Sequence, residues 1–140
     1  MALHELGHVL HAKLSGGEVR RVDLHPLEFS QTWVEPNPHP LFVAWGGAAW
    51  GTALPVLATA LMRHGSIGKV TRFFAGFCLI ANGAYVAIGP FMRAGDGRDI
   101  ARYGVPSLLL IVVGAIAVAA GLWTWHKLGS GVRGRSAPAT

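Results

Sequence analysis

The sequence predicts an all-α membrane protein: a bundle of three spanning helices preceded by a short N-terminal helix, with a possible small β-hairpin at the membrane surface. Hydrophobic residues make up 51% of the 140 residues and charged residues 14%, whereas soluble domains contain about 25% charged residues. Three apolar runs of 22, 20 and 21 residues match the roughly 20 residues that a helix needs to cross a bilayer: Leu41–Met62, Phe73–Met92 and Val105–Trp125. We expect one membrane-embedded domain over residues 1–126 and a flexible polar tail over residues 127–140.

The net charge of +5 raises the question of a nucleic-acid partner. The twelve Lys and Arg residues are scattered through the predicted loops rather than clustered, so they favour anchoring to anionic membrane lipid instead. No nucleic-acid partner is expected. Six of these residues fall on each side of the predicted membrane, and the positive-inside rule therefore predicts no orientation.

The first predicted element is a short helix over Ala2–Leu14, which ends at Ser15-Gly16-Gly17. It contains the H-E-x-x-H motif His4-Glu5-Leu6-Gly7-His8. Residues four apart lie on one face of a helix, so both imidazoles can reach one metal ion, for which zinc is the natural candidate. Glu5 is then the general base for a metal-activated water. Because His4 would lie in an unsupported first turn, we expect the natural helix to begin upstream of Met1.

The polar segment that follows is predicted to form the hairpin. Val19–Leu24 and Phe29–Val34 show rough period-two alternation and are separated by His25-Pro26. The exposed edge of such a strand could hold an extended peptide by strand addition. A solvated loop without a binding role is the alternative.

Small and polar residues within the apolar runs suggest where the helices pack. Gly47 and Gly51 form a G-x-x-x-G pair that would let a neighbouring backbone approach closely. Asn82 is expensive in hydrocarbon and should face the bundle or a ligand. Gly89-Pro90 is expected to break the second run and to act as a gate. The third run, without a polar residue from Leu108 to Leu122, is expected to face lipid.

A third metal ligand is predicted in the loop Arg93–Gly104. Three spanning runs place this loop on the same side of the membrane as the motif helix, so a carboxylate can reach the metal. Asp96 is the predicted ligand because it is flanked by glycines. Asp99 is the alternative ligand or a partner that orients a histidine, and a cap of a short helix is the other role open to Asp96. His11 shares the face of the motif histidines and is a further alternative ligand.

Together these motifs resemble the site-2 protease family of intramembrane zinc metalloproteases (M50), and in particular its short bacterial members. The resemblance rests on the HELGH motif, Gly46-Gly47-Ala48, Asn82 and Asp96-Gly97, and covers most of residues 1–104. It implies zinc ligation by both motif histidines and Asp96, catalysis by Glu5, substrate binding by Asn82, and a bacterial cell membrane as the location. The spacing from Asn82 to Asp96 is longer than in the family motif Asn-x-x-Pro-x-x-x-x-Asp-Gly.

The expected function is therefore zinc-dependent hydrolysis of peptide bonds in transmembrane or membrane-associated proteins. Two other functions use the same features. An inactive membrane scaffold would keep the fold without turnover, and a metal-binding or transport protein would use the same ligands without hydrolysis.

Overall fold

A computed structural model describes residues 1–25 and 30–133. These residues form a short helix, a two-stranded sheet and four further helices: α1 (Ala2–Leu14), β1 (Val19–Asp23), β2 (Gln31–Val34), α2 (Pro40–Leu61), α3 (Gly65–Met92), α4 (Gly95–Arg102) and α5 (Ser107–Arg133). The mostly helical fold with a small hairpin is confirmed. The second strand was predicted from Phe29, which lies outside the described residues.

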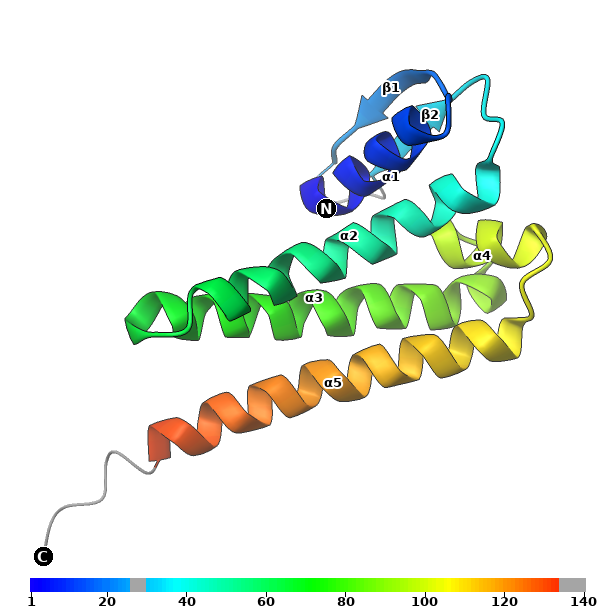
Figure 1. Cartoon of the computed structure of the whole chain (residues 1–140). Coiled ribbons are helices and arrows are strands. Elements are labelled where there is room, and N and C mark those ends of the chain that lie inside the picture. The colour runs from blue at the N-terminus through cyan, green and yellow to red at the C-terminus, as the bar shows by residue number, and fades with distance from the viewer. Residues whose placement is uncertain (26–29, 134–140) are drawn as a thin grey trace, which may run out of the picture.

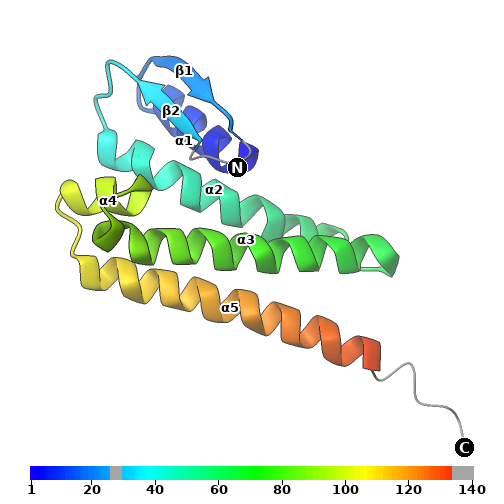
Figure 2. The same cartoon turned by 180° about the vertical axis from the view of Figure 1, so that it is seen from behind.

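Three long helices lie side by side, with α3 between α2 and α5 (Figures 1 and 2). Each of the three is long and apolar enough to cross a membrane. Consecutive long helices run in opposite directions, so the start of α2 and the short helix α4 lie at the same end of the bundle. This arrangement agrees with the expectation that the motif helix and the aspartate-bearing segment share one side of the membrane.

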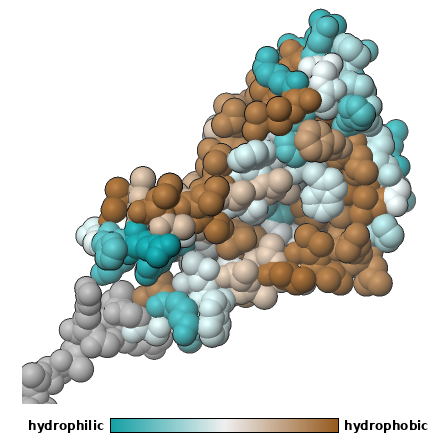
Figure 3. Space-filling model, in the orientation of Figure 1, coloured by the Kyte–Doolittle hydropathy of each residue, from teal (hydrophilic) through white to brown (hydrophobic). Residues whose placement is uncertain are grey.

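The surface of the bundle suits lipid. Large apolar side chains are exposed along the helices, among them Leu61 at 84% and Leu108 at 70%. Figure 3 shows broad hydrophobic areas over the helices, with hydrophilic residues gathered towards their ends. Only 17% of the most apolar stretch of α5 is buried, against 39% for that of α2. This exposure fits the prediction that the third run faces lipid.

Glycines allow α3 and α5 to approach closely. A Cβ added to Gly83 would lie 2.7 Å from the carbonyl oxygen of Gly114, and one added to Gly121 would lie 2.7 Å from that of Gly76. The two contacts are seven residues apart in each helix, which is about two turns. Because backbone meets backbone at both places, this pair packs by shape rather than by large side chains.

The motif helix α1 rests on the first half of α2. A Cβ added to Gly7 would lie 2.6 Å from the carbonyl carbon of Gly46, and one added to Gly46 would lie 2.8 Å from that of Gly7. Gly7 occupies one of the two variable positions of the H-E-x-x-H motif, and it is the point where the two helices cross. This contact turns the histidine-bearing face of α1 towards the bundle.

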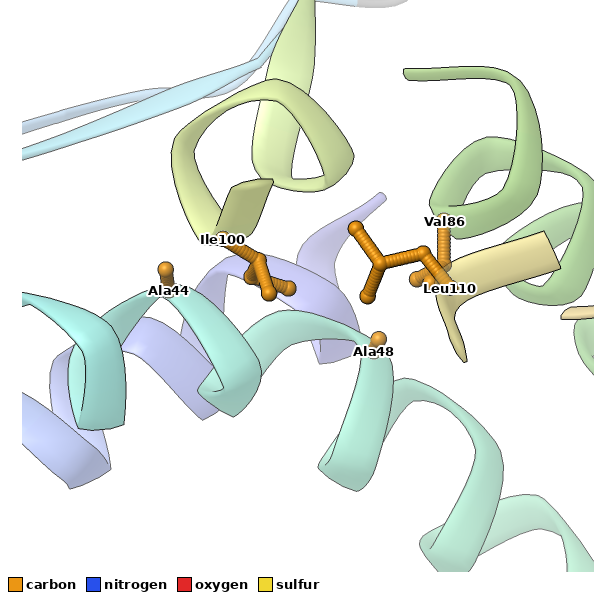
Figure 4. Packing of buried hydrophobic residues seen from close by; sticks show 5 residues of the cluster. All are labelled: Ala44, Ala48, Val86, Ile100 and Leu110. Atoms are coloured by element: carbon orange, nitrogen blue, oxygen red, sulfur yellow. The ribbon is translucent and has the colours of Figure 1, made fainter. Parts of the chain in front are cut away.

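A small apolar cluster fixes α4 against the long helices. Ala44 and Ala48 of α2, Val86 of α3, Ile100 of α4 and Leu110 of α5 meet in one place (Figure 4). Ile100 and Leu110 are completely buried. Burying an aliphatic side chain of this size contributes about 1.5–3 kcal/mol. Ile100 therefore holds α4, and with it Asp96, in a fixed position.

Several predicted boundaries are wrong. α3 begins at Gly65 instead of Phe73, and α5 continues to Arg133 instead of ending at Trp125. An apolar run marks the part of a helix that lies in hydrocarbon, and a helix can continue beyond it. The boundary expected between residues 126 and 127 therefore falls inside α5. The remainder of the expected tail, residues 134–140, lies outside the described residues.

The expected break at Gly89-Pro90 is also wrong. α3 continues through Pro90 to Met92 and ends at Arg93, whose φ is +51°. Pro90 lies in the last turn, where it removes only the hydrogen bond to the carbonyl of Val86, four residues earlier. A helix tolerates this loss near its end. α4, the short helix that follows, was considered only as an alternative in which Asp96 caps it.

Candidate metal centre

His4 and His8 project from one face of α1 towards α2, as the spacing of four residues predicts. Their ring centroids are 5.0 Å apart. Both side chains are largely buried, at 12% and 9% exposure. The two imidazoles therefore form a compact pair inside the protein.

Gly47 of α2 provides the space for this pair. A Cβ at Gly47 would overlap the Nε2 atoms of both histidines and would lie 2.7 Å from Cδ2 of His4. Gly47 lies seven residues after the start of α2 at Pro40, which is about 10 Å along the helix. The pair consequently lies inside the protein, about 10 Å from the end of the bundle at which α2 begins.

Asp96, in the first turn of α4, lies next to the Nε2 atoms of both histidines. Its Oδ2 lies 2.7 Å from Nε2 of His4, and its Oδ1 lies 3.2 Å from Nε2 of His8. Two glycines make this approach possible. Gly95 has a φ of +62°, and a Cβ at Gly97 would lie 2.6 Å from the carbonyl oxygen of Val86. The helix is capped at Ala94 without a side-chain bond, so Asp96 is not its N-cap.

The other nitrogens of the two imidazoles are bound to protein oxygens. Nδ1 of His8 lies 2.8 Å from the carbonyl oxygen of Val43, and Nδ1 of His4 lies 2.7 Å from Oδ1 of Asn82. A carbonyl oxygen only accepts hydrogen bonds, so each Nδ1 carries the proton and donates it. In a neutral imidazole, the lone pair then lies on Nε2 and faces Asp96. This orientation by a second hydrogen bond is typical of histidines that bind metals.

A carboxylate and two imidazole lone pairs that face one another require a cation. Oδ2 of Asp96 is buried, and none of the described residues gives it a hydrogen bond of good geometry despite the nearby Nε2 of His4. The ligand atoms of His4, His8 and Asp96 all lie within 4.8 Å of one another. One ion with metal–ligand distances of about 2.0–2.2 Å can bridge such a group. The residues therefore fit a metal ion.

The electrostatics of the cluster agree with this fit. Burial alone would raise the pKa of Asp96, but its contacts with His4 and His8 outweigh burial and lower the pKa to about 2. Burial alone would lower the pKa of His8, but Asp96, the carbonyl of Val43 and the charge of Glu5 outweigh it and raise the pKa. The cluster thus favours a positive charge at this position, whether a metal ion or a proton supplies it.

Glu5 lies beside the cluster and is held by the hairpin. It is only 3% exposed, and its Oε2 accepts a hydrogen bond of 2.7 Å from the hydroxyl of Thr32 in β2. Glu5, His4, His8 and Asp96 all line one cavity of about 670 Å³. The cavity is bordered by α1, β2, the start of α2, the second half of α3 and α4.

The structure brings together most of the predicted site residues, but two alternative ligands, Asp99 and His11, lie outside the ligand cluster. Asp99 lines the cavity but is not part of the ligand cluster. His11 turns away: its Nδ1 lies 2.6 Å from the carbonyl oxygen of Phe42, and its ring stacks on that side chain at 4.0 Å. The four remaining histidines are exposed, as predicted: His25, His39, His64 and His126.

Two contributors were missed by sequence reasoning. Thr32 belongs to no motif, although a polar residue on a predicted strand edge is a weak signal of a contact with the site. Gly47 was predicted to admit a neighbouring backbone together with Gly51, but Gly47 faces the two imidazoles and Gly51 faces the amide of Asn82. The close backbone contact is made by Gly46 instead.

Comparison with known proteins adds no assignment. No family model, curated protein or solved structure matches the chain significantly. His4, His8 and Asp96 could hold a metal ion next to three helices long and apolar enough to span a membrane.

Proposed function

We propose that this chain is an intramembrane zinc metalloprotease. The observation that carries the proposal is the meeting of His4, His8 and Asp96 around one point, with the buried carboxylate of Glu5 in the same cavity. A set of two His and one carboxylate leaves an open coordination position, as catalytic sites require. The resemblance to site-2 proteases, which rests on the same residues, supports this function.

Zinc is proposed from the donor set together with the neighbouring acid. Two imidazoles and one carboxylate also suit Fe(II), but a carboxylate directly after the first ligand is typical of zinc hydrolases. When bound, zinc supplies Lewis-acid activation of a water molecule and of the peptide carbonyl.

Glu5 moves the proton in the proposed reaction. Thr32 occupies Oε2, which leaves Oε1 to accept a proton from the attacking water. The water oxygen bonds to the carbonyl carbon, the C–N bond breaks, and Glu5 passes the proton to the departing amine. The carboxylate is regenerated, so the reaction consumes one water and no other reactant.

The proposed substrate lies as an extended strand beside β2. All four residues of β2 line the cavity. Successive residues of a strand point to opposite faces, so the edge of the strand, rather than one face, borders the cavity. Among the described strands, β2 pairs only with β1, and its other edge can therefore pair with a peptide. A transmembrane substrate has to unwind locally to make this contact.

The test is peptide cleavage by the purified chain, loaded with zinc in detergent micelles. A mixture of labelled apolar transmembrane peptides is added, and products are identified by mass spectrometry. Glu5→Gln should lower the cleavage rate by about 10²–10⁴-fold, the usual contribution of a general base, without loss of zinc. Glu18→Gln is the matched control, because Glu18 is 61% exposed and pairs with Arg20 at the surface.

Three outcomes would overturn the proposal. The first is a wild-type chain that binds no transition metal. The second is equal cleavage by the wild type and Glu5→Gln. The third is a zinc-loaded wild type that cleaves none of the peptides but moves zinc across the membrane of a sealed liposome, which would indicate a transport protein.

A further inference from the structure

We infer that Asn82 is a positioning residue that holds His4 in the orientation needed to bind the metal, rather than a residue that binds substrate. The inference rests on the proposed metal centre and does not require that the centre hydrolyses peptides. It assigns a role within the site to the middle of α3, the central helix of the bundle.

The amide of Asn82 is satisfied on both sides, which fixes its direction. Its Nδ2 donates a hydrogen bond of 2.8 Å to the carbonyl oxygen of Cys78, one turn earlier in α3. Oδ1 must therefore be the atom that faces His4, and it accepts a hydrogen bond of 2.7 Å from Nδ1. The backbone of α3 thus determines, through Asn82, which nitrogen of His4 carries the proton.

Gly51 leaves space for the amide on the side of α2. A Cβ at Gly51 would lie between 3.0 and 3.3 Å from Oδ1, Nδ2 and Cγ of Asn82. Only glycine leaves room at this distance without displacing the amide. Asn82 is therefore enclosed by Cys78 on its own helix, Gly51 on the next helix and His4 on α1.

The cavity separates the two possible roles of Asn82. The residues that line it include His4, Glu5, His8 and Asp96, but not Asn82. Asn82 lies behind His4, on the side of the imidazole opposite to Asp96. It can act on the metal through His4, whereas a peptide in the cavity would meet the imidazole first.

The test measures zinc affinity in the absence of any peptide, by competition with a chromophoric chelator in detergent micelles. Asn82→Leu keeps a side chain of similar size but removes both hydrogen bonds. Removing a partner that orients a metal ligand usually weakens metal binding by about 10–100-fold, and we expect a loss in this range. The visible absorption spectrum of the cobalt-substituted protein should change as well, because the orientation of His4 changes.

Thr52→Val is the matched control. The Thr52 hydroxyl also donates a hydrogen bond of 2.8 Å to a carbonyl of its own helix, that of Ala48, and is next to Gly51, but it has no bond to either histidine. Its replacement should leave zinc affinity and the cobalt spectrum unchanged. If Asn82→Leu does not fold, as judged by circular dichroism, Asn82→Ala takes its place with the same expected loss.

Zinc affinity and cobalt spectrum like those of the wild type, in a folded Asn82 variant, would overturn the inference. A variant with wild-type zinc affinity that raises KM for a cleaved peptide would instead support substrate binding. A wild-type chain that binds zinc tightly but cleaves nothing would refute the proposed protease and leave the role of Asn82 intact.

Discussion

Replacing Gly47 by alanine should weaken metal binding while leaving the helices in place. The added Cβ would occupy space next to the Nε2 atoms of His4 and His8, on the side of α2. Neither imidazole can remain where it is. The change adds one methyl group and alters no charge, so any loss of zinc affinity comes from the displacement of the ligands.

The size of the effect follows from the hydrogen bonds that hold the rings. The Cβ would lie 2.7 Å from Cδ2 of His4 and closer still to its Nε2, whereas ordinary contact begins at 3.4 Å, so this ring has to move by at least about 0.7 Å. Moving both rings breaks or weakens the bonds to Asn82 and to the carbonyl of Val43. At about 1 kcal/mol for each bond, the cost is about 2 kcal/mol, or about a 30-fold loss of zinc affinity.

Zinc affinity of Gly47→Ala is measured by chelator competition, alongside a thermal unfolding curve followed by circular dichroism. Gly129→Ala is the control, because a Cβ at this helical position meets nothing within 4 Å, and it should bind zinc like the wild type. Zinc binding by Gly47→Ala within about twofold of the wild type, a change of about 0.4 kcal/mol, would refute the proposed packing of the imidazoles against α2.

Three further predictions concern the ligands and the base. Asp96→Asn should weaken zinc binding by more than about 100-fold, since it removes a ligand rather than a partner of one, whereas Asp99→Asn should not; equal effects would contradict the ligand assignment. The pKa of Asp96 is lowered to about 2, so its carboxylate stays ionised at neutral pH. The pKa of His8 is raised, so protons compete with zinc for this imidazole already above the usual histidine pKa of about 6.5. In zinc titrations at a series of pH values, affinity should therefore fall as pH decreases, by up to about tenfold per unit for one competing proton, and a flat profile would refute this. Thr32→Val should slow peptide cleavage by roughly tenfold or more, because it removes the bond that orients Glu5, with zinc affinity unchanged and activity restored in Thr32→Ser; loss of zinc would show that Thr32 supports the fold instead.

The part of the site that follows from helical periodicity could be predicted from the sequence. His4 and His8 are four residues apart, and a helix brings such residues to one face whatever surrounds it. The choice of the loop Arg93–Gly104 needed only the number of spanning runs, which determines the side of the membrane for each loop, and the flanking glycines then favoured Asp96 within it. The structure agrees with both expectations because neither depends on details of packing.

The contacts between helices could not be predicted in the same way. The bond from Asn82 to His4 joins residues 78 positions apart, and Gly51 leaves space for the amide. The length of α3 was underestimated because hydropathy does not report where a helix ends outside hydrocarbon. α4 is predicted only as an alternative, because this helix has eight residues, most of them polar or glycine.

The distribution of the ligands between helices has a consequence for how a peptide can be admitted. His4 and His8 belong to α1, which crosses α2, whereas Asp96 belongs to α4, which is anchored by Ile100. A bound ion would tie these two helices together directly, so the gap between them cannot widen while the metal is in place. The hairpin lines the cavity through Thr32 but contributes no ligand, so an outward movement of the hairpin would leave all three ligands on the ion.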